Sequence, residues 1–236
     1  MDTSVNIIEI VMTILSWGVI GFFFYYLYQK QEAKPKIWKA FVATFVGLFT
    51  FSFNIPLFET ILDVPILPLG VWILLWYASS REGAWEKYRR FAWLGFSANF
   101  IFIATTLLTV FIHHAVYPKS NLSTYIANIE EVAISQLHPS AEDVTLDQES
   151  LELHVSSFEK APVTSMDWYN VMIDTEPHER VEQFPYQLSG TSSKWGSGIP
   201  TMIYVEKDGK GLLIDSSERQ RYFRSDVTIL KGGNDE

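Results

Sequence analysis

The sequence predicts a membrane protein in two parts: a four-helix transmembrane bundle over residues 1–117, then a small α+β domain outside the cytoplasm over residues 118–231. Two observations carry this prediction. From Phe91 to Tyr117 no residue carries a fixed charge, and a helix of that length exceeds the roughly 30 Å thickness of the hydrocarbon core. Before Tyr117 the chain has eight Lys and Arg against seven Asp and Glu, and from Tyr117 onward it has ten against twenty. The net charge of −9 therefore belongs to the second part.

The acidic balance and the cysteine count limit the possible functions. Nucleic-acid phosphates require a basic surface, so this composition argues against nucleic acid as a partner. The chain has no cysteine, which excludes disulfides, thiolate metal sites and a cysteine nucleophile. A second part of about 120 residues can fold on its own hydrophobic core without such crosslinks.

Four apolar segments are the predicted membrane spans. They cover residues 7–27, 40–57, 62–79 and 91–116. Ala43 and Gly47 in the second span have the small-residue spacing that permits close helix contact. Pro65 and Pro68 shorten the uninterrupted part of the third span, so a re-entrant segment is the alternative there.

Basic residues between the spans predict the orientation. They follow the first span at Lys30, Lys34, Lys36 and Lys39, and the third at Arg81, Lys87, Arg89 and Arg90. Basic flanks mark the cytoplasmic side. The connection 58–65 carries Glu59 and Asp63 without a basic residue, so we expect it outside, together with the N-terminus and everything after Tyr117.

The compartment follows from the first residues and the span plan. Residues 1–9 carry two acids and no Lys or Arg, unlike the basic start of a cleavable signal peptide. A compact four-span plan without a signal peptide favours a bacterial plasma membrane. The lipid bilayer is therefore one expected partner.

The outer domain is predicted as one helix on a mostly antiparallel sheet. Apolar residues recur at helical spacing over 122–137, after a possible N-cap at Ser120 or Asn121. Strands are expected at 151–155, 168–173, 183–188 and 227–230, and residues 232–236 are expected to be a disordered tail.

The clearest local signal in the outer domain is Asp208-Gly209 between two apolar runs within 201–215. It predicts a β-hairpin with a two-residue type I′ turn. That register places Val205 opposite Leu212 and Ile203 opposite Ile214.

Histidines are the first candidate site residues. His113 and His114 lie at the outer end of the fourth span, and His178 lies among acidic residues of the outer domain. Imidazoles can sense pH or bind a metal. Adjacent helix positions point about 100° apart, however, so the pair cannot readily chelate one ion. An interfacial polar collar is the alternative for the pair, and a solvated turn is the alternative for His178; no metal or other cofactor is expected.

Ser97 and Asn99 are the polar residues in the cytoplasmic half of the fourth span. An amide in hydrocarbon usually forms hydrogen bonds across helices, so both residues are expected to make contacts within the bundle. The alternative is a transport or substrate path.

The stretch 189–199 combines three glycines and five Ser or Thr residues with Lys194 and Trp195. We expect a mobile surface loop, in which Trp195, a residue type favoured at binding hot spots, and Lys194 are candidates for contact with a ligand or partner. The alternatives are that Trp195 packs back on the sheet or inserts at the lipid surface.

No motif in the sequence decides the function. A folded acidic exterior without a catalytic constellation favours a non-enzymatic membrane protein that binds a ligand or an envelope protein, as a sensory, regulatory or assembly subunit. The alternative is a small membrane transporter or membrane-embedded enzyme that uses the four-span bundle.

Overall fold

The computed structural model describes residues 5–32, 34–58, 60–164, 168, 182–216 and 219–232. It divides into two compact units: residues Ile8–Ile112, and a second unit that runs from His113 onward and includes the chain up to Ile7. The predicted strand over 168–173, the position of His178 and the tail from residue 233 lie outside the described residues, apart from Trp168.

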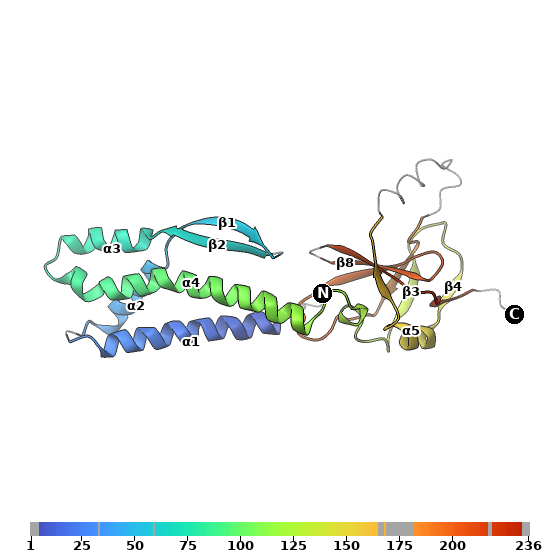
Figure 1. Cartoon of the computed structure of the whole chain (residues 1–236), viewed down its shortest axis with the longest axis horizontal. Helices are drawn as coiled ribbons and strands as arrows, with labels where there is room; N and C mark the ends of the chain where they lie inside the picture. The colour runs from blue at the N-terminus through green and yellow to red at the C-terminus, as the bar shows by residue number, and fades with distance from the viewer. Residues whose placement is uncertain are drawn as a thin grey trace. The chain divides into compact units, whose positions relative to one another are not determined.

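Within the described residues, two helices are long and apolar enough to cross a membrane by length and composition, namely α1 (Ile7–Gln29) and α4 (Ala84–Val116). Figure 1 shows them running side by side. The Oγ of Ser16 in α1 lies 2.8 Å from the Oγ1 of Thr105 in α4. The rings of Trp17 and Phe102 meet edge to face with centroids 5.4 Å apart. Apolar packing and one polar contact therefore join the two long helices.

The predicted four-span bundle is not confirmed, because the second and third spans are not continuous helices. Helix α2 (Ile37–Gly47) and helix α3 (Leu69–Ser79) have 11 residues each, which at 1.5 Å per residue cover only about half of the hydrocarbon core. Between them, β1 (Phe51–Leu57) and β2 (Thr60–Leu67) form an antiparallel hairpin alongside α4 (Figure 1).

The sequence of the hairpin explains why helix gives way to strand. The segment is rich in β-branched and aromatic residues, which favour strands. Pro56, Pro65 and Pro68 lack the N–H groups that a continuous helix would need. Backbone contact then fixes the end of α2, since a Cβ added at Gly47 would collide with the carbonyl oxygen of Ala92 in α4.

Helix α4 begins at Ala84, so residues expected in a loop, including Lys87, Arg89 and Arg90, lie on its first turns. The apolar stretch expected from Phe91 continues the same helix to Val116. The helix starts earlier than expected because residues 84–90 contain no proline. Their charged residues are compatible with the solvated first turns of a helix.

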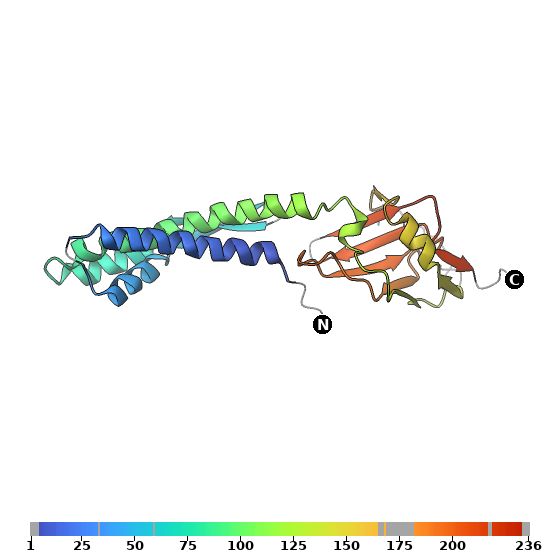
Figure 2. The same cartoon turned by 90° about the horizontal axis from the view of Figure 1, so that it is seen from below.

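The second unit is built on an antiparallel sheet of six described strands in the order β3-β6-β7-β8-β9-β5 (Figure 2). The strands are β3 (Ala133–Gln136), β5 (Glu159–Ala161), β6 (Tyr186–Ser189), β7 (Thr201–Val205), β8 (Gly211–Ser216) and β9 (Gln220–Arg224). A separate pair joins β4 (Val144–Leu146) to β10 (Leu230–Gly232). Helices with antiparallel sheets are thus present.

The core of this unit lies where α5 (Gln148–His154) and the segment after α4 cover the sheet (Figure 2). Leu151 of α5, Leu122 and Tyr125 are fully buried against Ile203 and Phe223 of the sheet. These residues bring the chain leaving α4 onto the sheet within a few residues of the helix end.

Two elements predicted for the second unit are wrong. The helix over 122–137 is limited to a 3-10 turn, η1 (Leu122–Thr124), and the chain then runs to strand β3. The backbone leaves the helical path because Ala127 N donates to Ser192 O at 2.8 Å. The strand over 151–155 is instead helix α5, whose start is set by Asp147 accepting from Ser150 N at 3.1 Å.

The predicted hairpin register is confirmed, with Val205 opposite Leu212 and Ile203 opposite Ile214. The type I′ turn is wrong, because that turn requires positive φ at both central residues and only Gly209, with φ 69°, has it. Glu206 O accepts from Gly209 N at 2.9 Å and Glu206 N donates to Gly211 O at 2.8 Å. A four-residue loop built on an ordinary turn and a left-handed glycine therefore closes the hairpin.

Candidate functional site

Three successive carbonyl oxygens of the loop before β7 accept hydrogen bonds from residues at or next to the ends of the two long apolar helices. Trp195 O accepts from the hydroxyl of Tyr117 at 3.0 Å, and Gly196 O accepts from the backbone N of Ile7 at 3.1 Å. Ser197 O lies 2.7 Å from Nε2 of His113. Because a carbonyl can only accept, His113 carries its proton on Nε2. Ile7 is the first residue of α1, and His113 lies in the last turn of α4.

The loop, defined here as residues 190–198, needs its glycines for this path. Gly190, Gly196 and Gly198 have φ of 77°, 76° and 68°, a conformation that costs other residues energy. A Cβ on Gly196 would lie 2.8 Å from Cδ1 of Ile7, and one on Gly198 would lie 2.6 Å from Cβ of Asn6. The glycines that predict a mobile loop instead allow the start of α1 to approach it.

The other side of the loop is held by the segment that follows α4. Lys194 N donates to Thr124 O at 3.0 Å, and Ser192 forms an isolated bridge with Asn128. The Oγ1 of Thr124 donates to Pro118 O at 2.9 Å. The loop is thereby fixed to the N-terminal segment, to the end of α4 and to the chain after it.

The side chain of Trp195 projects from this fixed backbone and is 84% exposed. It does not pack back on the sheet. Nζ of Lys194 lies 5.8 Å from the centroid of the Tyr117 ring, within cation–π range. An exposed tryptophan on a fixed backbone presents a large contact area with little conformational entropy to lose.

A groove of about 820 Å³ runs beside Trp195. Its lining combines apolar side chains, among them Ile7 and Ile199, with hydroxyl and amide groups such as Thr191 and Asn128. Among the described lining residues, the charged one is Lys194. The volume is in the range of small-molecule sites, and the lining suits a ligand with apolar and hydrogen-bonding groups.

Of the remaining predicted site residues, those that the structure describes are not among the residues that line the groove. His114 is exposed beside His113, and His178 lies outside the described residues. In the described part of the chain, no three His, Cys, Asp or Glu side chains converge as a metal site would require. Ser97 is exposed on α4.

Asn99 is half-buried, and its Nδ2 lies 3.3 Å from Leu48 O, beyond the end of α2. It also lies 3.1 Å from Phe96 O and 3.4 Å from Gly95 O on its own helix. The amide thus supplies a donor to a carbonyl that is left without a helical partner where α2 stops.

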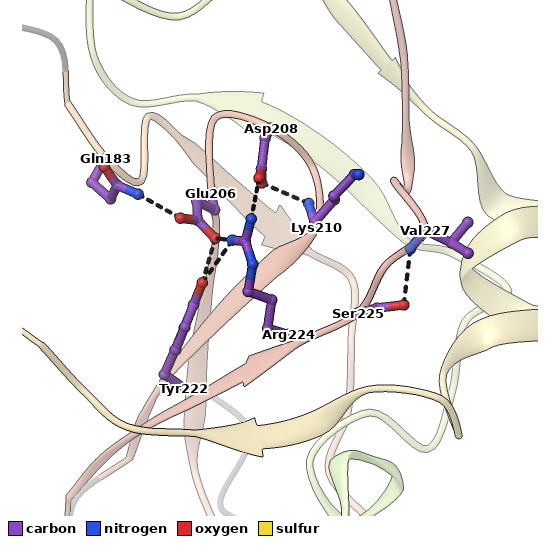
Figure 3. Close-up of polar contacts among 8 residues, drawn as sticks. All are labelled: Gln183, Glu206, Asp208, Lys210, Tyr222, Arg224, Ser225 and Val227. Carbon is purple, nitrogen blue, oxygen red and sulfur yellow. Dashed lines mark hydrogen bonds and ion pairs between the residues drawn. The ribbon is translucent and has the colours of Figure 1, made fainter.

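A second polar cluster, which the sequence did not predict, lies at the turn between β7 and β8 (Figure 3). The carboxylate of Glu206 is buried and accepts from the Gln183 amide, the Arg224 guanidinium and, at 2.5 Å, the Tyr222 hydroxyl. Arg224 also donates to Asp208 at 2.6 Å. The only sequence signal is an acidic residue directly after an apolar strand.

Burial first, and then the hydrogen bond to Glu206, raise the pKa of Tyr222 to about 12. The hydrogen bond with Tyr222 raises the pKa of Arg224 above its already high ordinary value. Tyr222 therefore stays protonated and Arg224 stays charged. A fully satisfied network of this kind fixes the turn and β9 relative to each other.

Comparison with protein-family models, with curated proteins and with solved structures gives no match to this chain. Inference about function therefore depends on the geometry of the chain itself.

Proposed function

We propose that the chain is an integral membrane protein whose outer domain binds a ligand or an envelope protein in the groove beside Trp195. In this role it is a sensory, regulatory or assembly subunit without catalysis of its own. The supporting observation is that the backbone of Trp195, Gly196 and Ser197 both lines the groove and bonds to the ends of α1 and α4.

The membrane placement rests on α1 and α4 together with the charges that flank them. Lys30, Lys34, Lys36 and Lys39 follow α1, while Arg81, Lys87, Arg89 and Arg90 precede or begin the apolar part of α4. The positive-inside rule puts these residues in the cytoplasm, and therefore puts the N-terminus and the domain after Tyr117 outside a plasma membrane.

The groove contacts supply a route from binding to the membrane helices. A ligand that displaces Gly196 or Ser197 must lengthen or break a hydrogen bond to Ile7 or His113. Ile7 begins α1, and His113 lies in the last turn of α4. Such a ligand would therefore bind more tightly when these hydrogen bonds are broken than when they are made, and a signal requires such a difference in affinity between two arrangements.

The transporter alternative gains less support from the contacts. Asn99, the amide that would line a path in that alternative, donates to Leu48 O at 3.3 Å. That contact gives Asn99 a structural role within the unit Ile8–Ile112.

The test is site-specific photocrosslinking of the full chain in native membranes. A photoreactive side chain at Thr201, a groove-lining residue, is expected to capture one defined species, and Trp195→Ala is expected to abolish that capture. The same photoreactive group at Lys231, which is exposed and is not among the groove-lining residues, is the control. Capture that is equal at Thr201 and Lys231, or that is indifferent to Trp195→Ala, contradicts the proposal.

A further inference from the structure

The β1–β2 hairpin is a two-stranded sheet whose apolar side chains are largely exposed. Phe53 and Ile55 on β1 and Ile61 on β2 are each about half exposed or more. An isolated apolar hairpin is unstable in water. Its exposed apolar side chains therefore require a covering surface.

Two contacts within the unit Ile8–Ile112 show which part of α4 the hairpin lies beside. Near its base, Leu48 O meets Asn99, and at its tip the Phe58 ring lies 5.5 Å from the Phe111 ring. Asn99 and Phe111 are about 18 Å apart along a helix that rises 1.5 Å per residue. The hairpin therefore runs beside the uncharged outer half of α4 (Figure 1).

The two faces of the hairpin differ. Along β2, Leu62 is buried and Val64 is half-buried, while Ile61 and Asp63 between and beside them are exposed. Successive strand residues point to opposite faces, so Leu62 and Val64 share one face. Their cross-strand partners Ile55 and Phe53 are still about half exposed, so this face is covered by the rest of the chain only along β2. The other face carries Asp63 and Ile61 with their cross-strand partners Asn54 and Pro56, and toward the base the half-buried Ser52 and the buried Pro65. Its exposed part, the four residues from Asn54 to Pro56 and from Ile61 to Asp63 that point this way, is called here the outward face.

The outward face therefore carries one polar pair. Asn54 and Asp63 are directly opposite each other, with the apolar pair Pro56 and Ile61 next to them toward the tip. A carboxylate at membrane depth is costly unless it faces protein or water, and it marks a functional contact by default. The pair offers one amide donor and one carboxylate acceptor side by side.

We propose that the outward face is covered by the same face of a second copy of this chain. A two-fold axis parallel to the strands places Asn54 of each copy against Asp63 of the other, and Pro56 against Ile61. Each amide then donates to a carboxylate across the interface, and like groups are diagonal to each other. The same axis can lie along the membrane normal, so both copies keep one orientation in the bilayer.

Self-complementarity selects this occupant. A lipid chain leaves both polar groups unpaired, and an unrelated protein would have to carry a matching acceptor and donor in the same order. A second copy supplies them by symmetry. The inference rests on the proposed membrane placement, because the desolvation that makes the polar pair decisive arises there.

The test uses the full chain in phosphatidylcholine and phosphatidylglycerol vesicles. Because the chain has no cysteine, Lys231→Cys gives one labelling site for donor and acceptor fluorophores. Energy transfer between copies reports self-association as the protein-to-lipid ratio is varied. The wild-type hairpin is expected to associate, and Asn54→Asp, which opposes carboxylates across the interface, is expected to weaken association at least about tenfold.

The exchange variant Asn54→Asp with Asp63→Asn restores one amide and one carboxylate in each pair, so association is expected to recover. Gln29→Glu makes the same amide-to-carboxylate change at an exposed position outside the hairpin and is expected to leave association unchanged. A wild-type chain that stays monomeric at high density, or an exchange variant as weak as Asn54→Asp, overturns the inference.

Flotation of the same vesicles separates this inference from the proposed function. A chain that does not float with the lipid removes both. A chain that floats but shows no energy transfer between copies removes only the self-association.

Discussion

The imidazole Nε2 of His113 lies 2.7 Å from the carbonyl oxygen of Ser197, 84 residues later in the chain. The ring of His113 also contacts Tyr117, with centroids 5.0 Å apart. His113 is thus the residue through which the last turn of α4 holds the loop that carries Trp195. His114, one position on, is exposed.

Replacing His113 by Ala should release the loop. The lost hydrogen bond is expected to cost about 1 kcal/mol of unfolding free energy. Hydrogen exchange should quicken at the amides of Ile7 and residues 194–198. His113→Gln, which can place a donor at a similar reach, should recover much of the protection, and His114→Ala is the matched control. Equal exchange in the His113→Ala and His114→Ala variants would show that the contact does not hold the loop.

The glycines of the loop give a second prediction. Gly196→Ala and Gly198→Ala should each destabilise the second unit by about 1–2 kcal/mol, because both positions have positive φ and a Cβ there meets Ile7 or Asn6. Gly232→Ala is the control, since a Cβ there meets no atom within 4 Å. Denaturant unfolding measures the difference. Stability changes as small as that of Gly232→Ala would contradict the close approach.

Features that depend on neighbouring residues in the chain could be predicted from the sequence. The alternating residues around Asp208-Gly209 were enough to set the pairing of Val205 with Leu212. The unbroken charge-free run after Phe91 was enough to predict one long helix. In both places, short-range pattern and final structure agree.

Other features could not be read from local pattern. A fully apolar run has no periodicity, so the change from α2 to β1 after Gly47 looks the same in sequence as a continuing helix. Leu122 and Tyr125 are buried as their spacing suggested. Their helix stops because Ala127 bonds to Ser192, a contact between residues 65 positions apart.

The candidate site divides in the same way. Composition alone drew attention to Lys194 and Trp195. The contacts of the loop with Ile7 and His113 depend on the folded backbone, and so does the Glu206 network, whose members come from three separate segments. Such long-range pairs leave no periodic trace in one sequence.

The Glu206 network predicts a large effect from a single carboxylate. Glu206→Leu should cost about 2–3 kcal/mol, because it leaves the buried hydroxyl of Tyr222 and the amide of Gln183 without their acceptor. Lys207→Met is the control at the next position. It breaks only the exposed pair with Glu142 and should change stability by less than about 0.5 kcal/mol. Equal losses in the two variants would exclude a special role for the network.

The raised pKa of Tyr222 predicts how stability falls in alkaline solution. Burial and Glu206 raise this pKa from its ordinary value of 10.0 to about 12. The folded protein therefore holds the phenol proton more tightly than the unfolded chain does. Its contribution to stability is complete below pH 10 and declines as the pH rises through about 12.

Tyr222→Phe should lower stability at pH 8, since the hydrogen bond to Glu206 is lost, but should flatten the decline between pH 10 and pH 12. Thermal unfolding of the full chain at a series of pH values measures both effects. Tyr204→Phe is the matched control, because Tyr204 lies on β7, two strands away from β9, and its hydroxyl contacts Met202 rather than Glu206. Because lysines and other tyrosines titrate in the same range, the decisive quantity is the difference between the two variants. Parallel curves for Tyr222→Phe and the wild type above pH 10 would show that this phenol titrates alike in the folded and unfolded chain.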